Sequence, residues 1–338
     1  MHATEIPTPA PVIDRRTFEA NLDIMTAAHP GAALRPHVKA HKCTAIARAQ
    51  HERRHTGFTC ATPREVLGMA DAGLGDDLLL ANETIDSRRL AAMAARQDDA
   101  SITIAVDSEA TVAAAIAAGI RRCVIDVDVG LPRCGCAPAA AGHLADTARA
   151  GGVEVRGVMG YEGHLMMVTD RAQQQRQVAD AMELLSQAHR DVGGDIVSAG
   201  GTGTYDLHGD TGITELQAGS YALMDTQYAT LGLPFGHALT IRGTVIAVKD
   251  GYAVADVGLK ALGMDHGNPK VALDGVDVWF CSDEHITFGA GQMQLTVGDP
   301  VAVLPAHVDP TMAMHSVAYV LDGEEVVDAW PIDLRGWD

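Results

Sequence analysis

The chain has 338 residues, enough for about two domains and a full hydrophobic core. Hydrophobic residues make up 47% and charged residues 20%, and no run of about 18 apolar residues occurs, which argues against a transmembrane span and against extensive disorder. The formal charge of −19 repels phosphates and anionic lipids, so neither a nucleic acid nor a membrane is expected as a partner.

The N-terminal segment and the cysteines indicate the compartment. Residues 1–16 contain three prolines but neither a basic n-region nor an apolar h-region, so no secretory signal is recognised. The six scattered cysteines suit a reducing environment, and we expect a cytoplasmic protein. Cys134 and Cys136 are interpreted as small residues in a turn, because no second cysteine pair lies at the spacing of a zinc site.

Residues 20–235 alternate short apolar runs with Ala-rich segments of helical character. Segments such as 108–119 and 171–192 place apolar residues at steps of three and four, as helices do. The rhythm predicts an α/β fold, a (β/α)8 TIM-like barrel, with an open doubly wound sheet as the alternative. The eight predicted strands are 33–42, 57–61, 77–81, 102–106, 123–129, 154–160, 195–199 and 214–218.

After about residue 235 the pattern changes to β-branched alternation interrupted by Asp-Gly pairs. Asp-Gly suits the type I′ turn of a β-hairpin, so the pairs at 250–251, 274–275 and 322–323 predict three hairpins. They would join 244–249 to 252–257, 270–273 to 276–280, and 317–321 to 324–330. The domain prediction is an N-terminal segment, 1–19, that packs with the β domain, a barrel over 20–235, and an antiparallel β domain over 236–338.

The first predicted strand carries a dense group of cationic and imidazole side chains. With a period of two, Arg35, His37, Lys39 and His41 face the barrel interior and Lys42 points outward. Isolated buried cations are costly, so an anionic or electrophilic partner is required. A partly desolvated lysine among cations can form an imine with an aldehyde, but Lys39 can equally pair with carboxylates. The segment alone favours neither interpretation.

Seven motifs follow one another over nearly the whole chain: RPHVKAHK (35–42), GFTCATPREV (57–66), VDVGLPRCG (127–135), GYEGH (160–164), AGGTGTY (199–205), ELQAGSYALMD (215–225) and PAHVD (305–309). In this order they resemble the D-threonine aldolase and D-serine dehydratase family, and most of all its metal-dependent D-threonine aldolases. The resemblance implies an alanine-racemase-like barrel that binds pyridoxal 5′-phosphate (PLP), a homodimer, and a small D-β-hydroxy-amino acid as substrate. It also implies that Lys39, rather than Lys42, carries PLP covalently.

Glycine-rich turns after the seventh and eighth predicted strands are candidates for the phosphate of this cofactor. Backbone N–H groups and a hydroxyl there can bind an anion, and phosphate sites in such barrels commonly use these two loops. The resemblance places Thr202, Gly219 and Ser220 at the phosphate. Three further residues are assigned to the ring: Arg133 near the phenolate oxygen, Tyr161, in preference to His164, flanking the ring, and Gln217 near the ring nitrogen.

His307 and Asp309 form the candidate metal site. Residues two apart on a strand project to one side, but chance alone gives about two such pairs in a chain of this composition. The resemblance supports the pair, because the dehydratases of the family carry H-x-C at this place and the aldolases H-x-D. Imidazole with carboxylate favours a hard divalent ion over zinc, with Mn²⁺ first and Mg²⁺ or Co²⁺ as alternatives.

The predicted activity is PLP- and divalent-metal-dependent retro-aldol cleavage of D-β-hydroxy-α-amino acids, in which D-threonine gives glycine and acetaldehyde. His41 is the candidate catalytic group that takes the proton of the substrate hydroxyl, with water on the metal as the alternative. Competing hypotheses are β-elimination by a D-serine or 3-hydroxy-D-aspartate dehydratase, a 3-hydroxy-D-aspartate aldolase, and a non-catalytic PLP-binding protein. Asp309 in place of cysteine favours the aldolase, and the metal pair argues against the non-catalytic protein.

Overall fold

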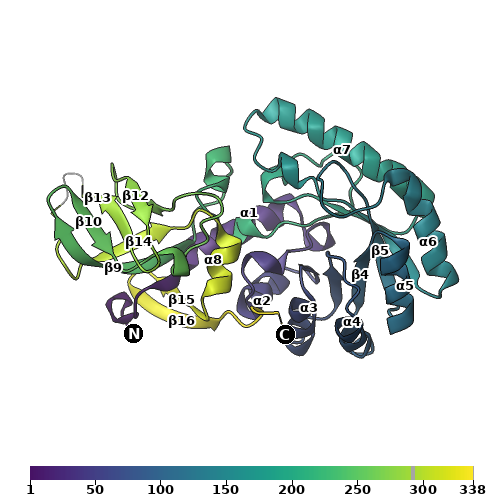
Figure 1. The fold of residues 1–338 in the computed structure, drawn as a ribbon, viewed down its shortest axis with the longest axis horizontal. Coiled ribbons are helices and arrows are strands. Elements are labelled where there is room, and N and C mark those ends of the chain that lie inside the picture. The colour runs from purple at the N-terminus through teal and green to yellow at the C-terminus, as the bar shows by residue number, and fades with distance from the viewer. Residues whose placement is uncertain (291–293, 338) are drawn as a thin grey trace. The chain divides into compact units, whose positions relative to one another are not determined.

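The computed structural model describes residues 1–290 and 294–337, which divide into two compact units (Figure 1). The barrel unit contains Met25–Lys39 and Ile46–Gly219, with the C-terminal end from Gly336. The β unit contains Met1–Ile24, Ala40–Ala45 and Ser220–Arg335. The domain limits at residues 20 and 235 stay a prediction. Within the described residues, every helix is too short or too polar to cross a membrane.

The barrel unit is built on a parallel sheet of seven strands in the order β2-β3-β4-β5-β6-β7-β8. Helices alternate with these strands, and Figure 1 shows α4, α5, α6 and α7 on the outside of the sheet. Helix α5 begins after Ser108, whose hydroxyl caps it, and ends at Gly119 with φ +75°, as its sequence predicts. The bounds are β2 Gly57–Cys60, α3 Pro63–Asp71, β3 Asp77–Leu80, α4 Ser87–Ala94, β4 Ile102–Val106, α5 Glu109–Ala118, β5 Arg122–Asp126, α6 Ala141–Ala150, β6 Glu154–Met159, α7 Arg171–Val192, β7 Ile196–Ala199 and β8 Glu215–Leu216.

Residues 34–37 close the barrel, but the first predicted strand is wrong beyond them. Leu34 makes a parallel bridge to Leu216 in β8, and His37 makes one to Thr59 in β2. The last backbone hydrogen bond to the β8 side runs from the His37 N–H to the Ala218 carbonyl, at 3.0 Å. Beyond this bond, Val38–Ala40 forms a 3-10 turn. The period of two therefore does not describe Lys39 or His41.

Charged side chains pair with one another at the N-terminal ends of the barrel strands. Buried Arg35 pairs with Asp77 (Nη2–Oδ2 2.6 Å) and with Glu215 (Nε–Oε1 2.7 Å). Arg156 on β6 contacts the other oxygen of Asp77 at 2.6 Å. For Arg35, the anionic partner that the sequence predicts is therefore this pair of carboxylates. An apolar layer formed by Leu79, Ala105, Val124, Met159 and Ile196 packs as a separate cluster of the barrel core.

The β unit contains a mixed sheet of nine strands in the order β12-β13-β10-β9-β1-β15-β16, with β14 pairing with β9 and β11. The N-terminal strand β1 pairs antiparallel with β9 and parallel with β15, so the sheet is not purely antiparallel. Its strands are β1 Ala10–Asp14, β9 Leu239–Lys249, β10 Tyr252–Ala255, β11 Lys270–Val271, β12 Val278–Cys281, β13 Ile286–Gly289, β14 Pro300–Leu304, β15 Val317–Asp322 and β16 Glu325–Pro331. The remaining helices are α1 Arg15–Ala28, α2 Thr44–Glu52 and α8 Val308–Met314.

Two of the three Asp-Gly hairpins are present. Residues 250–251 connect β9 to β10, and residues 322–323 connect β15 to β16. The third hairpin is wrong, because β11 pairs with β14 and β12 pairs with β13. Gly275 has φ +69°, as a tight turn requires, so the dipeptide marks a change of direction there. It does not decide which strand the chain pairs with next.

Candidate active site

Tyr161 brings two of the predicted cofactor residues together in the barrel unit. It follows β6, and the Nζ of Lys39 lies 5.7 Å from the centroid of its ring. The guanidinium carbon of Arg133, in the loop after β5, lies 5.4 Å from the same centroid. Cations at this distance are attracted by the ring's π electrons. The structure therefore gathers Lys39, Arg133 and Tyr161 into one cluster, although Lys39 lies on a turn rather than a strand.

Carboxyl groups adjoin this cluster near Arg133. Asp126 ends β5 and is buried, and this burial, together with the nearby carboxylate of Glu83, raises the pKa of Asp126 to about 8. A hydrogen bond to Glu83, and then burial, raises the pKa of the Cys134 thiol to about 11. Burial and Glu83 thus favour the protonated form of Asp126, which can donate a hydrogen bond. Without a bound metal ion, Cys134 stays a thiol at neutral pH.

The glycine-rich loop after β7 packs closely against the segment that follows β6. Thr202–Thr204 forms a 3-10 turn in which Thr202 is buried. A Cβ added to Gly203 would lie 2.3 Å from the carbonyl oxygen of Met166, and one added to Gly201 would lie 2.8 Å from its sulfur. The loop thus needs glycine at position 203, whereas a larger residue at position 201 would require the Met166 side chain to move. Its backbone N–H groups and the Thr202 hydroxyl suit the phosphate of PLP.

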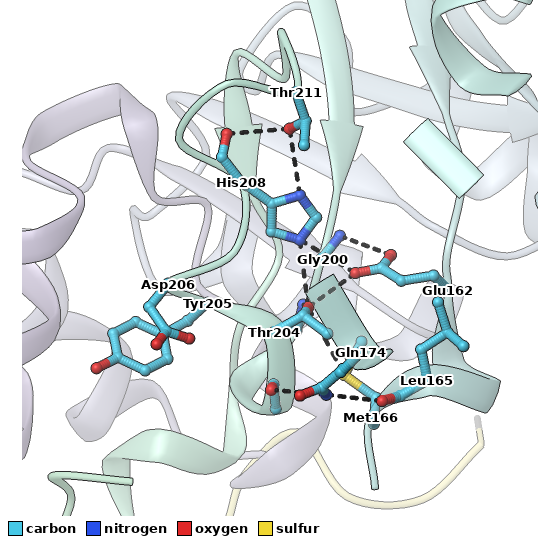
Figure 2. Close-up of polar contacts among 12 residues, drawn as sticks. Glu162, Leu165, Met166, Gln174, Gly200, Thr204, Tyr205, Asp206, His208 and Thr211 are labelled. Atoms are coloured by element: carbon cyan, nitrogen blue, oxygen red, sulfur yellow. Dashed lines mark hydrogen bonds and ion pairs between the residues drawn. The ribbon is translucent and has the colours of Figure 1, made fainter. Parts of the chain in front are cut away.

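Figure 2 shows the network that holds this loop. Glu162, the neighbour of Tyr161, accepts hydrogen bonds from the Gly200 N–H (3.2 Å) and from the Thr204 hydroxyl (2.7 Å). Its Oε1 also lies 3.1 Å from Nε2 of His208, and the two side chains are 0% and 1% exposed. Burial alone would raise the pKa of Glu162, but the hydrogen bond and charge of His208 and the Thr204 hydroxyl hold it below its ordinary value.

Helix α7 fixes the same loop from its other side. The buried amide of Gln174 donates to the Leu165 carbonyl at 2.7 Å (Figure 2) and to the Gly203 carbonyl at 3.2 Å. Arg171 donates to the Gly203 carbonyl at 2.8 Å. Sequence patterns did not single out Glu162, His208 or Gln174. The one signal available was the position of Glu162 inside the motif that ends the sixth strand.

Three further predicted cofactor residues follow β8: Gln217 and Gly219 belong to the barrel unit, and Ser220 belongs to the β unit. Gln217, directly after β8, donates through Nε2 to the Ser198 hydroxyl on β7 at 2.8 Å. Gly219 is buried and is the last residue of this stretch of the barrel unit. Ser220 begins the next stretch of the β unit, where its Oγ lies 3.4 Å from Oδ2 of Asp309.

His41 lies in the β unit and is fully buried. Its Nδ1 accepts a hydrogen bond from the Cys43 N–H at 3.1 Å. The neutral ring therefore carries its proton on Nε2, which makes that nitrogen a donor. This arrangement does not favour His41 as the group that takes a proton from the substrate.

His307 and Asp309 lie at the start of helix α8 and not on a strand, so the predicted strand geometry is wrong. Pro310 cannot donate in a sheet but is tolerated in the first turn of a helix, and Asp309 suits the positive end of the helix dipole. The two side chains still meet, with Nε2 of His307 3.7 Å from Oδ2 of Asp309. Both atoms can reach one ion at about 2.1 Å, so these residues fit a divalent metal.

Three further acidic or imidazole residues surround this pair in the β unit. Asp265 places Oδ2 2.8 Å from Nδ1 of His307, and the ring of His266 stacks on the ring of His307. Buried Asp225 accepts from the Val308 N–H at 3.0 Å and so caps α8. Burial raises the pKa of Asp225, although the hydrogen bonds that its carboxylate accepts act to lower it. None of the three was expected from sequence, because they lie far from the H-x-D motif along the chain.

Comparison with known proteins finds similarity over nearly the whole chain. Residues 13–227 match the model of the alanine racemase N-terminal domain, and residues 238–321 match that of a putative serine dehydratase domain. The chain is 33% identical to the D-threonine aldolase of Arthrobacter sp, over 98% of this chain and 93% of that protein.

Two solved structures extend this similarity. The crystal structure of D-threonine aldolase from Filomicrobium marinum matches with a TM-score of 0.92 and 31% identity, covering 98% of this chain and 96% of that one. D-threo-3-hydroxyaspartate dehydratase from Delftia sp. HT23 matches with a TM-score of 0.91 and 25% identity over 99% and 100%, and a cysteine-to-alanine mutant of it was solved in the metal-free form. The chain belongs to the D-threonine aldolase and D-serine dehydratase family of PLP-dependent lyases, built on the alanine-racemase fold.

Proposed function

We propose that the chain cleaves D-β-hydroxy-α-amino acids by a retro-aldol reaction that needs PLP and a divalent metal, with D-threonine giving glycine and acetaldehyde. The observation that carries the aldolase over the dehydratase is the imidazole–carboxylate pair of His307 and Asp309, 3.7 Å apart. A carboxylate at this place matches the aldolase form of the motif, whereas the dehydratases of the family carry a cysteine. The 33% identity to a D-threonine aldolase supports the same choice.

The barrel residues would hold the cofactor from several sides. Lys39 is the proposed point of covalent attachment. Arg133, which like Lys39 lies near the Tyr161 ring, would contact the phenolate oxygen of PLP. Thr202, Gly219 and Ser220 would bind the phosphate, and Gln217, a neutral amide, would face the ring nitrogen. Once bound, PLP supplies an electron sink for the pair of electrons left when the Cα–Cβ bond breaks.

The metal residues would act on the substrate hydroxyl. His307 and Asp309 would hold the ion, Mn²⁺ in preference to Mg²⁺ or Co²⁺, and a divalent ion lowers the pKa of a hydroxyl bound to it. Because Nδ1 of His41 already accepts the Cys43 N–H, we propose that water rather than His41 takes the hydroxyl proton. His41 would then act as a donor through Nε2.

A parallel assay of three substrates tests the reaction type. Purified protein with PLP and Mn²⁺ receives D-threonine, 3-hydroxy-D-aspartate or D-serine, with L-threonine and added chelator as controls. Glycine plus an aldehyde, formed from the D-substrates and lost with chelator, is the expected result. Ammonia plus an oxo acid would show β-elimination instead, and no turnover under any condition would favour a non-catalytic PLP-binding protein.

Lys39→Ala tests the attachment point. Borohydride reduction should fix PLP to the wild-type chain and to Lys42→Ala, which removes the neighbouring lysine of the same motif. Lys39→Ala should give no fixed PLP by mass spectrometry. Fixed PLP in Lys39→Ala, or its loss in Lys42→Ala, would contradict the assignment.

We also propose that the chain forms a homodimer in the cytoplasm. None of the six cysteines, all of which lie among the described residues, forms a disulfide, which supports a reducing compartment. Light scattering on the purified protein should give about twice the chain mass of 35.5 kDa. A monomer mass at assay concentrations would contradict the dimer.

A further inference from the structure

We propose that Asp265 is a positioning residue of the metal centre, which holds the Nδ1–H of His307 so that Nε2 is presented as the metal ligand. This inference rests on the metal site of the proposed function and adds to it a residue outside the H-x-D motif. Asp265 lies 42 positions before His307 in the sequence.

The hydrogen bond between the two side chains fixes which ring nitrogen can bind a metal. Oδ2 of Asp265 lies 2.8 Å from Nδ1 of His307, and a carboxylate can only accept, so Nδ1 carries the proton. The lone pair of the neutral ring is then on Nε2. This is the nitrogen that lies 3.7 Å from Oδ2 of Asp309. Histidines that bind metals generally donate their other N–H to a carboxylate or carbonyl in this way, which orients the ring and raises its basicity.

The backbone brings Asp265 to this place. Gly263 forms an antiparallel bridge with His307, and its N–H donates to the Thr311 hydroxyl at 2.9 Å. A Cβ on Gly263 would lie 2.3 Å from Cγ of Pro310, so the segment packs directly on the first turn of α8. The packed backbone at Gly263 thus leads into the turn in which Asp265, with a side chain 55% exposed, meets His307.

His266 is placed to support the ring of His307 and not to bind the same ion. The two ring centroids are 3.9 Å apart and the planes differ by 16°. Imidazole lone pairs lie in the ring plane, so two stacked rings direct them along nearly parallel planes that do not converge on one ion. Nε2 of His266 also lies 3.6 Å from Oδ2 of Asp265. His266 thus covers one face of His307 beside the carboxylate that orients it.

Metal titration of the PLP-loaded protein tests the inference without relying on turnover. After removal of bound metal with chelator, Mn²⁺ is titrated by calorimetry into wild type, Asp265→Ala and Asp265→Glu. Asp265→Ala should bind Mn²⁺ about 10–100-fold more weakly, and Asp265→Glu should recover part of the affinity. Asp277→Ala removes an exposed carboxylate of the same unit and is the matched control, which should bind as wild type does. His266→Ala should stay within about threefold of wild type.

Parallel titrations of His307→Ala and Asp309→Ala separate this inference from the proposed function. If both lose Mn²⁺ while Asp265→Ala binds it as wild type does, the positioning role is overturned and the metal site stands. If both still bind Mn²⁺ as wild type does, the metal site itself is wrong. A loss of Mn²⁺ in His266→Ala equal to that in His307→Ala would make His266 a ligand and overturn the supporting role given to it here.

Discussion

Nε2 of His208 lies 3.1 Å from Oε1 of Glu162, with both side chains buried in the barrel unit (Figure 2). The same carboxylate accepts from the Gly200 N–H and the Thr204 hydroxyl. The pair thus joins the end of β6, where Tyr161 lies, to the loop that carries Thr202. Because the cost of burying the Glu162 carboxylate offsets much of what its partners contribute, these contacts define the shape of the loop more than they add to net stability.

Removing one partner of this pair should be strongly destabilising. His208→Ala leaves the Glu162 carboxylate buried beside a cavity, and loss of one member of a buried pair typically costs about 3–5 kcal/mol. Urea unfolding followed by tryptophan fluorescence measures the change in free energy. His143→Ala, which removes an exposed histidine paired with Glu109, is the control and should change stability by less than about 0.5 kcal/mol. A small effect of His208→Ala, below about 1 kcal/mol, would contradict the role given to the pair.

Glu162 also predicts a specific sensitivity to acid. Its folded pKa lies below the ordinary value of 4.5, so its ionised form stabilises the folded state above about pH 4.5. That contribution is lost as the pH falls through the folded pKa. Glu162→Gln has no such group, so the stability advantage of wild type over this variant should be constant from pH 7 to 5 and shrink below pH 4.5. An advantage that stays unchanged to pH 3 would show that folding does not lower the pKa of Glu162, and one that grows as the pH falls from 7 to 5 would show that the native carboxyl is protonated.

The barrel was largely predictable from sequence because its signals are local. Seven of the eight predicted strands coincide with β2 to β8, and α7 occupies the predicted range. The failures depend on pairing partners. Residues 38–42 are not in a strand, because backbone pairing with the segment after β8 ends with the hydrogen bond from His37 to Ala218. Strand β12, which follows Gly275, pairs with β13 instead of with β11. Periodicity and turn chemistry do not specify those partners.

The site was predictable where residues form a compact motif. Lys39, Arg133 and Tyr161 meet, and so do His307 and Asp309, although the latter pair lies on a helix start. The residues that hold the site were missed because their contacts bridge distant parts of the chain. Glu162 and His208 are 46 positions apart, and Asp265 and His307 are 42 apart. A lone glutamate or aspartate carries no sequence signal of such a partner.

Arg35 should matter for stability rather than for chemistry. It lies at the N-terminal ends of the strands, between Asp77 and Glu215. Burial would raise the pKa of Asp77, but Arg156 and Arg35 hold it below its ordinary value. Arg35→Ala leaves Glu215 without this partner, so we expect a loss of about 3–5 kcal/mol in the free energy of unfolding.

The control for this variant is Arg88→Ala, which removes an arginine that is 91% exposed and should have little effect. Binding of PLP, followed by its absorbance at a temperature well below the melting point, should be retained in Arg35→Ala. Loss of PLP without loss of stability would place Arg35 in the cofactor site and contradict its structural role.

Asp126 gives a pH dependence of opposite sign to that of Glu162. Its folded pKa of about 8 lies above the ordinary value of 3.8, so between these values the native protein holds a proton that the unfolded chain has released. The stability contributed by this group therefore falls as the pH rises from about 4 to about 8. Asp126→Asn keeps an uncharged donor at the same place and does not titrate. The free energy of unfolding of the variant should therefore rise relative to that of wild type as the pH increases across this window. The rise should reach at least about 1 kcal/mol at pH 8, since one pKa unit corresponds to about 1.4 kcal/mol.

Urea unfolding of the PLP-free proteins at pH 5, 6, 7 and 8 measures this difference directly. Asp146→Asn removes an exposed carboxylate of α6, so its difference from wild type should stay nearly flat over the same range. If the Asp126→Asn difference is equally flat, or falls as the pH rises, the carboxyl is ionised in the native protein. Arg133 would then lie beside a charged aspartate, and the neutral hydrogen-bond donor assigned here to the end of β5 would be wrong.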